Sequence, residues 1–124
     1  DGWITPHVTP EEYANHYATI EKLAAEKGNG RKYGRAFNCF SCVKDSPREG
    51  WESVHSHLED FHGPPIRDDV VDRWAVAGPP ENIASRLNEF IGIGVTHFQL
   101  VIGDPDQFGQ MKKIADQVLP LLHR

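Results

Sequence analysis

The chain has 124 residues, a formal net charge of -5 at pH 7 and two cysteines, which suits one small domain with a modest core. The negative charge argues against nucleic acid and anionic membrane surfaces as partners, and no apolar run approaches the roughly 20 residues that span a bilayer. Two cysteines do not form a disulfide framework and no basic-then-apolar leader is present, so we expect a reduced, cytoplasmic protein.

The first predicted elements are a strand, a helix and a second strand. Residues 3–5 are typical of a strand remnant, and Thr9-Pro10-Glu11-Glu12 supplies a capping residue, an early proline and a glutamate at the third helical position. Gly28 and Gly30 end this helix, and the aromatic, apolar residues 36–43 predict a strand. The apolar face of the helix is expected to hold Tyr13, Tyr17, Ile20, Leu23 and Ala24.

A second helix is predicted to begin at Ser46-Pro47-Arg48-Glu49, which repeats the first start signal, and to end at His62. Its apolar face is expected to hold Trp51, Val54, Leu58 and Phe61. Gly63-Pro64-Pro65 breaks this helix. Residues 67–74 predict a short third helix.

The last third of the chain predicts a helix, a strand and a final helix. Gly78-Pro79-Pro80-Glu81 opens the first of these helices, residues 95–102 form a strand, and Asp104-Pro105 starts the final helix. The buried positions of the two helices are expected to be Ile83, Ala84, Leu87, Phe90 and Ile91, and then Phe108, Met111, Ile114, Ala115, Val118 and Leu122.

This alternation of strands and helices predicts an α/β fold with parallel strands joined by right-handed crossovers. Three strands do not close a barrel of the type that uses eight. We therefore expect residues 1–124 to form a single, partial α/β domain. Its sheet would have two unpaired edges and one uncovered face, which something else must cover.

Five segments resemble the luciferase-like flavin and deazaflavin oxidoreductases, in an order and spacing more specific than any single one of them. They are Asp1-Gly2-Trp3, Asp72-Arg73-Trp74, Gly78-Pro79-Pro80-Glu81, Gly94-Val95-Thr96-His97-Phe98 and Val118-Leu119-Pro120-Leu121-Leu122. The first segment is similar to the sixth strand of the family's (β/α)8 TIM barrel, and residues 74–103 are similar to its last helix-to-strand step. The resemblance covers almost the whole chain.

The resemblance implies that the chain is the C-terminal part of a luciferase-like oxidoreductase or monooxygenase acting on a small molecule. Members of the family bind FMN or a deazaflavin (coenzyme F420), and residues 72–74 look closer to the deazaflavin branch. Most flavin contacts in the family lie on the first five strands, which are missing here. The chain alone is therefore expected to bind no cofactor, to be inactive, and to associate with the missing N-terminal part or with a second copy.

Barrel geometry places the candidate site residues, because strand ends and the following helix starts meet at one rim. This rim would hold residues 5–7, 44–46, 78–80 and 103–104. His7 is a candidate for orienting a substrate and Lys44 for pairing with an anion, although both are also explained as solvated rim residues. No catalytic residue is assigned. The resemblance suggests Gly2, Trp3, Thr5 and Gly78 as cofactor-binding residues, whereas burial alone also explains the tryptophans.

Two alternatives belong to other functional classes. Exposed sheet edges would suit a non-enzymatic assembly module that dimerises. Cys39 and Cys42, followed by His57 and His62, nearly match the spacing of a zinc finger. Because the cysteines lie in a strand-like run and would point to opposite faces of the sheet, no metal ligand is assigned.

Overall fold

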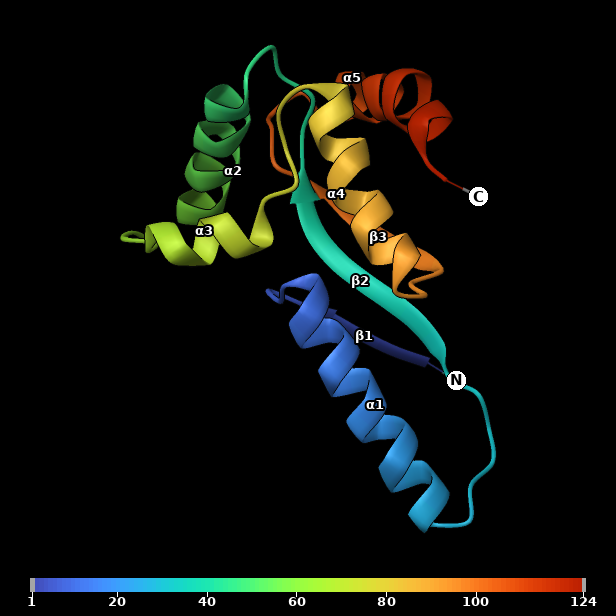
Figure 1. Ribbon diagram of the computed structural model, residues 1–124. Coiled ribbons are helices and arrows are strands. Elements are labelled where there is room, and N and C mark those ends of the chain that lie inside the picture. Colours follow the sequence, from blue (N-terminus) through green and yellow to red (C-terminus); the bar gives the residue numbers. More distant parts are fainter. Residues whose placement is uncertain (1, 124) are drawn as a thin grey trace.

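The computed structural model describes residues 2–123, so Asp1 of the Asp-Gly-Trp segment lies outside the described residues. Helices and parallel strands alternate along the chain (Figure 1). The elements are β1 (Gly2–Pro6), α1 (Pro10–Glu26), β2 (Gly34–Ser41), α2 (Pro47–His62), α3 (Asp68–Trp74), α4 (Pro80–Gly92), β3 (His97–Ile102) and α5 (Gln107–Lys113), which continues as a π-helical turn (Ile114–Val118) and a 3₁₀ turn (Leu119–Leu121).

The sheet has the order β1-β2-β3, with β2 paired in parallel to both neighbours. Within residues 2–123, no strand pairs with the outer edge of β1 or of β3. These observations confirm the predicted partial α/β barrel with an open sheet. The pairing of residues 75–78 was not predicted: they run parallel to the end of β2, beyond the end of β1, through the bridges Phe40–Ala75 and Val43–Gly78.

The starts of α1 and α2 form as the sequence predicts, whereas α5 begins at Gln107, with Asp106 as its capping residue, rather than at residues 104–105. Thr9 Oγ1 accepts a hydrogen bond from the amide of Glu12 at 3.2 Å, and the Glu12 carboxylate accepts from the amide of Thr9 at 2.8 Å. In α2, Ser46 Oγ accepts from the amide of Glu49 at 3.2 Å. Each contact satisfies a helix-end N–H group that would otherwise lack a partner. Within residues 2–123, no helix is long and apolar enough to cross a membrane.

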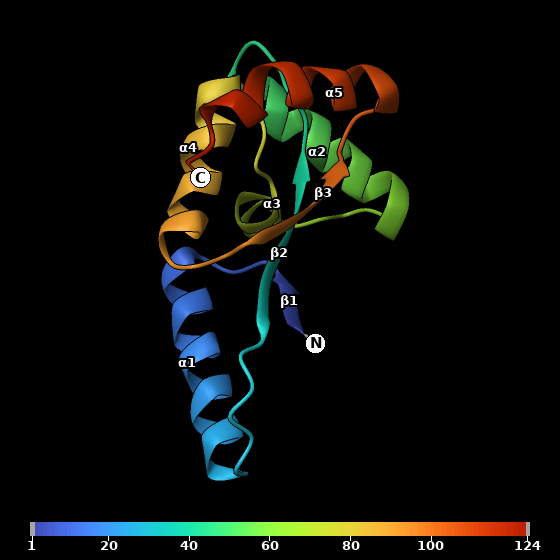
Figure 2. The ribbon, with the colours of Figure 1, turned by 90° about the vertical axis from the view of Figure 1, so that its right-hand side faces the viewer.

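Helices cover the two faces of the sheet unequally. Figure 2 shows α1 and α4 on one side of the strands and α2 on the other. We call the side of α1 and α4 the outer face, because such helices ring the outside of a barrel, and the opposite side the inner face. The outer core includes Tyr13, Phe37, Leu87, Phe90 and Ile114. The inner core includes Phe40, Cys42, Val54, Leu58 and Val71.

Within residues 2–123, the inner face is covered only toward the C-terminal ends of its strands. There α2 and α3 pack over Phe40 and Val101. Nearer the strand starts, Ile4 is 48% exposed, and His97 and Gln99 are also exposed. The expected uncovered face is therefore only partly uncovered.

The apolar face predicted for the last helix is partly wrong. Phe108 is 85% exposed, and Met111 and Ala115 are exposed as well. Gln110 occupies the buried position instead, because both ends of its amide bind the backbone of β2's C-terminal extension. Ile114 and Val118 are buried as predicted.

Two further positions predicted on apolar helix faces are exposed. Phe61 is 75% exposed near the end of α2, and Leu23 is 53% exposed in the last turns of α1. Both follow the helical period, but each helix extends beyond the layer that it covers. Phe61 instead lines a pocket on the inner face.

Candidate functional site

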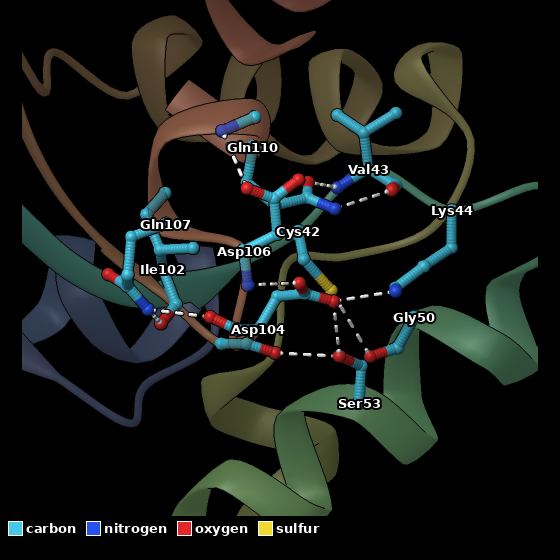
Figure 3. A network of polar contacts seen from close by, with 12 residues as sticks. Cys42, Val43, Lys44, Gly50, Ser53, Ile102, Asp104, Asp106, Gln107 and Gln110 are labelled. Carbon is cyan, nitrogen blue, oxygen red and sulfur yellow. Dashed lines mark hydrogen bonds and ion pairs between the residues drawn. The ribbon is translucent and has the colours of Figure 1, made fainter. Parts of the chain in front are cut away.

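A polar network joins the C-terminal ends of β2 and β3 to the starts of α2 and α5 (Figure 3). The ammonium group of Lys44 lies 2.6 Å from Oδ2 of Asp104. The hydroxyl group of Ser53 lies 2.8 Å from the carbonyl oxygen of Gly103 and 3.1 Å from Oδ2 of Asp104. The amide of Asp106 donates to Oδ1 of Asp104 at 2.9 Å. Both carboxylate oxygens of a buried aspartate are thereby satisfied.

The electrostatics of this pair favour its ionised form. Burial raises the pKa of Asp104, but hydrogen bonds from Lys44, the Asp106 amide and Ser53 outweigh burial, and the pKa falls below its ordinary value. The hydrogen bond to Asp104 raises the pKa of Lys44. Lys44 therefore reaches the rim as predicted, with its charge already paired.

Gln110 holds the end of β2 in place. Its Oε1 accepts from the amide of Val43 at 2.7 Å, and its Nε2 donates to the carbonyl oxygen of Val43 at 3.2 Å. The two bonds reproduce the pairing of a neighbouring strand. They fix the residue directly before Lys44, so Gln110 contributes to the rim. Its only signal in the sequence is a polar residue within an apolar pattern.

Gly78 lies beside Lys44, as the rim argument predicts. Its carbonyl oxygen accepts from the amide of Lys44 at 2.9 Å, and its amide donates to the carbonyl oxygen of Cys42 at 3.0 Å. Its φ of 116° is accessible mainly to glycine. A Cβ atom at Gly50 of α2 would lie 2.3 Å from the Gly78 nitrogen. Glycine at both positions therefore lets α2 approach this backbone directly.

An aromatic pocket of about 260 Å³ lies on the inner face, where β2, β3, α2 and α3 meet. Trp74 forms one wall of this pocket. Its ring stacks on His62 with centroids 5.8 Å apart and meets Phe40 edge-on with centroids 5.0 Å apart. Trp74 Nε1 donates to Oδ1 of Asn38 at 3.4 Å. The lining residues are Asn38, Phe40, His57, Phe61, His62, Trp74 and Val101.

A second, polar pocket of about 450 Å³ lies at the rim and shares His57 with the aromatic pocket. It is lined by Lys44 and by two carboxylates, Asp60 and Asp104, so its fixed charge is acidic rather than basic. This balance does not favour an anion at Lys44.

His7 lies next to the aromatic pocket. It has a φ of 62°, an uncommon left-handed conformation for a residue with a side chain. Its ring lies 6.1 Å from the Trp74 ring in an edge-on arrangement. Among residues 2–123, its buried Nε2 atom has no hydrogen-bond partner, which is costly unless another group supplies one. The strained backbone and the unpaired nitrogen mark His7 as a candidate site residue.

Three of the predicted cofactor-binding residues do not face the aromatic pocket. Trp3 packs on Tyr13 at 4.8 Å on the outer face, and Thr5 shares that face by strand alternation. Gly2 begins β1, at the opposite end of the strand from the rim, where a Cβ atom would lie 3.0 Å from the Gly34 carbonyl oxygen. Packing and close strand pairing account for these residues, and their cofactor roles stay predictions.

The cysteines lie in different cores, as the strand pattern predicts. Cys39 belongs to the outer core and Cys42 to the inner core. Burial raises the pKa of Cys39 to about 12, and burial also raises the pKa of Cys42. The two thiols therefore do not face one metal ion. The part of the chain that the structure describes holds no group of three or more potential metal ligands.

Two solved structures share this fold. An F420-dependent secondary alcohol dehydrogenase, in complex with an F420–acetone adduct, matches with a TM-score of 0.80 at 17% identity, over 100% of this chain and 43% of that chain. The coenzyme F420-dependent tetrahydromethanopterin reductase from Methanopyrus kandleri matches with a TM-score of 0.69 at 14% identity, over 98% of this chain and 45% of that chain. No protein-family model and no curated protein matches.

The chain thus spans less than half the length of either enzyme. At these identities the likeness concerns the fold. It confirms the expected resemblance at that level, with the open parallel sheet corresponding to part of a larger α/β barrel. The chain has the fold of one portion of these two F420-dependent enzymes.

Proposed function

We propose that this chain is the C-terminal part of a luciferase-like oxidoreductase that uses a deazaflavin to transfer hydride to or from a small molecule. The observation that carries the proposal is the position of the aromatic pocket. It lies at the C-terminal ends of β2 and β3 on the inner face, where barrels of this type place their active sites. Both structural neighbours are F420-dependent enzymes, which favours a deazaflavin over FMN.

The residues present suit a planar, mainly apolar ring on the inner face. Ile4 leaves apolar surface open there, and His7 Nε2 lacks a partner among residues 2–123. A bound deazaflavin would supply the hydride acceptor or donor. His7 orients the substrate, and the Trp74 wall excludes water. Lys44, whose charge is paired with Asp104, borders the substrate site.

The remaining barrel strands are proposed to come from the missing N-terminal part or from a second copy. Apolar residues gather beside the free edge of β3, where pockets of about 440 and 500 Å³ are lined by Phe98, Leu100, Met111 and Leu119, among others. Exposed apolar surface next to an unpaired strand edge marks an association site. The chain alone is proposed to have no turnover, since it provides three strands of a barrel that needs eight.

The test is a hydride-transfer assay with the natural protein that contains these residues. Oxidised deazaflavin is mixed with the protein and a secondary alcohol, and loss of the absorbance of the oxidised cofactor is followed. We expect loss of absorbance with the deazaflavin and none with FMN. Reduction of FMN alone, or protein-independent rates with both cofactors, would contradict the proposal. The same assay on residues 1–124 tests the expected inactivity of the chain alone.

A further inference from the structure

The aromatic pocket has room for a single ring. Its volume of about 260 Å³ lies below the roughly 300 Å³ at which drug-sized ligand sites begin. It exceeds the roughly 150 Å³ of an apolar cavity that admits benzene. The pocket therefore accommodates one ring with a short substituent.

The walls of the pocket indicate an aromatic ring. Phe40, Trp74 and His62 present ring faces and edges, with Trp74 in contact with both others. Phe61 adds a fourth ring and is 75% exposed, although an exposed phenylalanine has no packing role in the core. Aromatic rings pack favourably edge-on or offset against such walls.

The polar atoms of the pocket indicate the substituent. The Oδ1 atom of Asn38 accepts from Trp74, whereas no protein group among residues 2–123 accepts a hydrogen bond from its Nδ2. His57 and His62 make ring contacts but no hydrogen bond within the described residues. A ligand oxygen can therefore receive a hydrogen bond here without displacing a protein partner.

The charge of the lining does not favour an ionised ligand group. Among residues 2–123, no lysine, arginine, aspartate or glutamate lines this pocket. The adjoining polar pocket, reached past His57, carries Asp60 and Asp104 against Lys44. A carboxylate or phosphate would lose hydration here without gaining the permanent positive charge of a lysine or arginine.

We propose that the aromatic pocket binds an uncharged, single-ring aromatic compound that carries a hydroxyl or carbonyl oxygen. Ring binding follows from the pocket itself, and only its identification as the substrate subsite rests on the proposed function.

The test is an NMR titration of the isotopically labelled protein with benzyl alcohol, without cofactor. We expect saturable shifts of the Trp74 indole N–H and the Asn38 side-chain amide. Benzoate, which has the same ring and a charge, is expected to leave these signals in place, and cyclohexylmethanol is expected to bind more weakly. Shifts confined to other residues, absence of saturation, or equal binding of all three compounds would overturn the proposal.

A matched pair of variants separates the pocket from general surface effects. Phe61→Ala removes an exposed pocket wall, and Phe108→Ala removes an exposed phenylalanine that does not line the pocket. Loss of one aromatic contact is expected to weaken benzyl alcohol binding by roughly threefold to tenfold in Phe61→Ala and to leave Phe108→Ala unchanged. Equal effects in both variants would overturn the assignment. Deazaflavin binding is measured separately, so ring binding without cofactor binding would count against the proposed function alone.

Discussion

Replacement of Gly50 by alanine is expected to destabilise the protein, although alanine normally strengthens a helix. Gly50 is buried in α2, and an added Cβ atom would lie 2.3 Å from the Gly78 nitrogen and 2.7 Å from the Ala77 carbonyl carbon. Contacts between such atoms are comfortable near 3.5–4.0 Å, so the two backbones must separate by about 1 Å.

The segment that must move is held on both sides. The Gly78 amide donates to Cys42 at 3.0 Å, and its carbonyl oxygen accepts from Lys44 at 2.9 Å. Overpacking of this kind lowers the free energy of unfolding by about 1–3 kcal/mol, whereas the higher helix propensity of alanine raises it by about 1 kcal/mol. Because the clashing atoms belong to hydrogen-bonded backbone, we expect the overpacking cost to lie near the upper end of its range. The free energy of unfolding should therefore fall by about 2 kcal/mol in total.

Urea denaturation followed by far-UV circular dichroism measures this difference. The control is Gly92→Ala at the end of α4, where an added Cβ atom meets nothing within 4 Å. That variant is expected to keep or gain stability, by up to about 1 kcal/mol. A Gly50→Ala protein as stable as the Gly92→Ala protein would refute the close approach of α2 to residues 77–78.

Three further predictions concern other parts of the molecule. The hydrogen-bonded ion pair with Arg73 and the hydrogen bond from the Thr9 amide together lower the pKa of Glu12 from 4.5 to about 2. The stability from this pair is present above the unfolded value and is lost as pH falls from 4.5 toward 2. Urea midpoints across that range should therefore fall more steeply for the native protein than for Glu12→Gln; parallel profiles would contradict this. Gln110→Leu leaves the buried Val43 amide unpaired and should lower the free energy of unfolding by about 1–3 kcal/mol, which a thermal melt detects. An unchanged melting temperature would argue against a stabilising role of the two hydrogen bonds between Gln110 and Val43. The chain alone should self-associate in sedimentation velocity, and Met111→Ser, in the apolar surface beside the free edge of β3, should weaken the association; a compact monomer at all concentrations would exclude it.

Local signals in the sequence predicted the strands and the helix starts well. The starts of α1 and α2 depend on Thr9 with Glu12 and on Ser46 with Glu49, contacts that span three residues. Both partners of each hydrogen bond lie within one helical turn, so the cap forms without a contact from a distant residue. The parallel arrangement followed from the alternation of elements.

The exposed face of α5 could not be read from the same patterns. Gln110 and Val43 are distant in sequence, and their paired hydrogen bonds set the rotation of the helix. The π-helical turn at Ile114–Val118 then shifts the helical phase. Phe108 and Met111, which precede the turn, therefore lie off the buried stripe that Ile114 and Val118 occupy.

The candidate site was predicted only where barrel geometry alone decides position. Lys44 and Gly78 meet at the rim for that reason. The pocket around Trp74 depends instead on α2 and α3 folding back over the inner face. No periodicity predicts that return, because it arises from contacts of Asn38 and Phe40 with residues far along the chain.

NMR mapping of a bound deazaflavin on the labelled natural protein would locate the redox site. We expect saturable shifts at inner-face and rim residues, including Ile4, Asn38 and Gly103, with little change at Phe37 on the outer face. Shifts centred on the outer face, or no saturable shift with the deazaflavin, would contradict the central claim that the inner face holds the redox site.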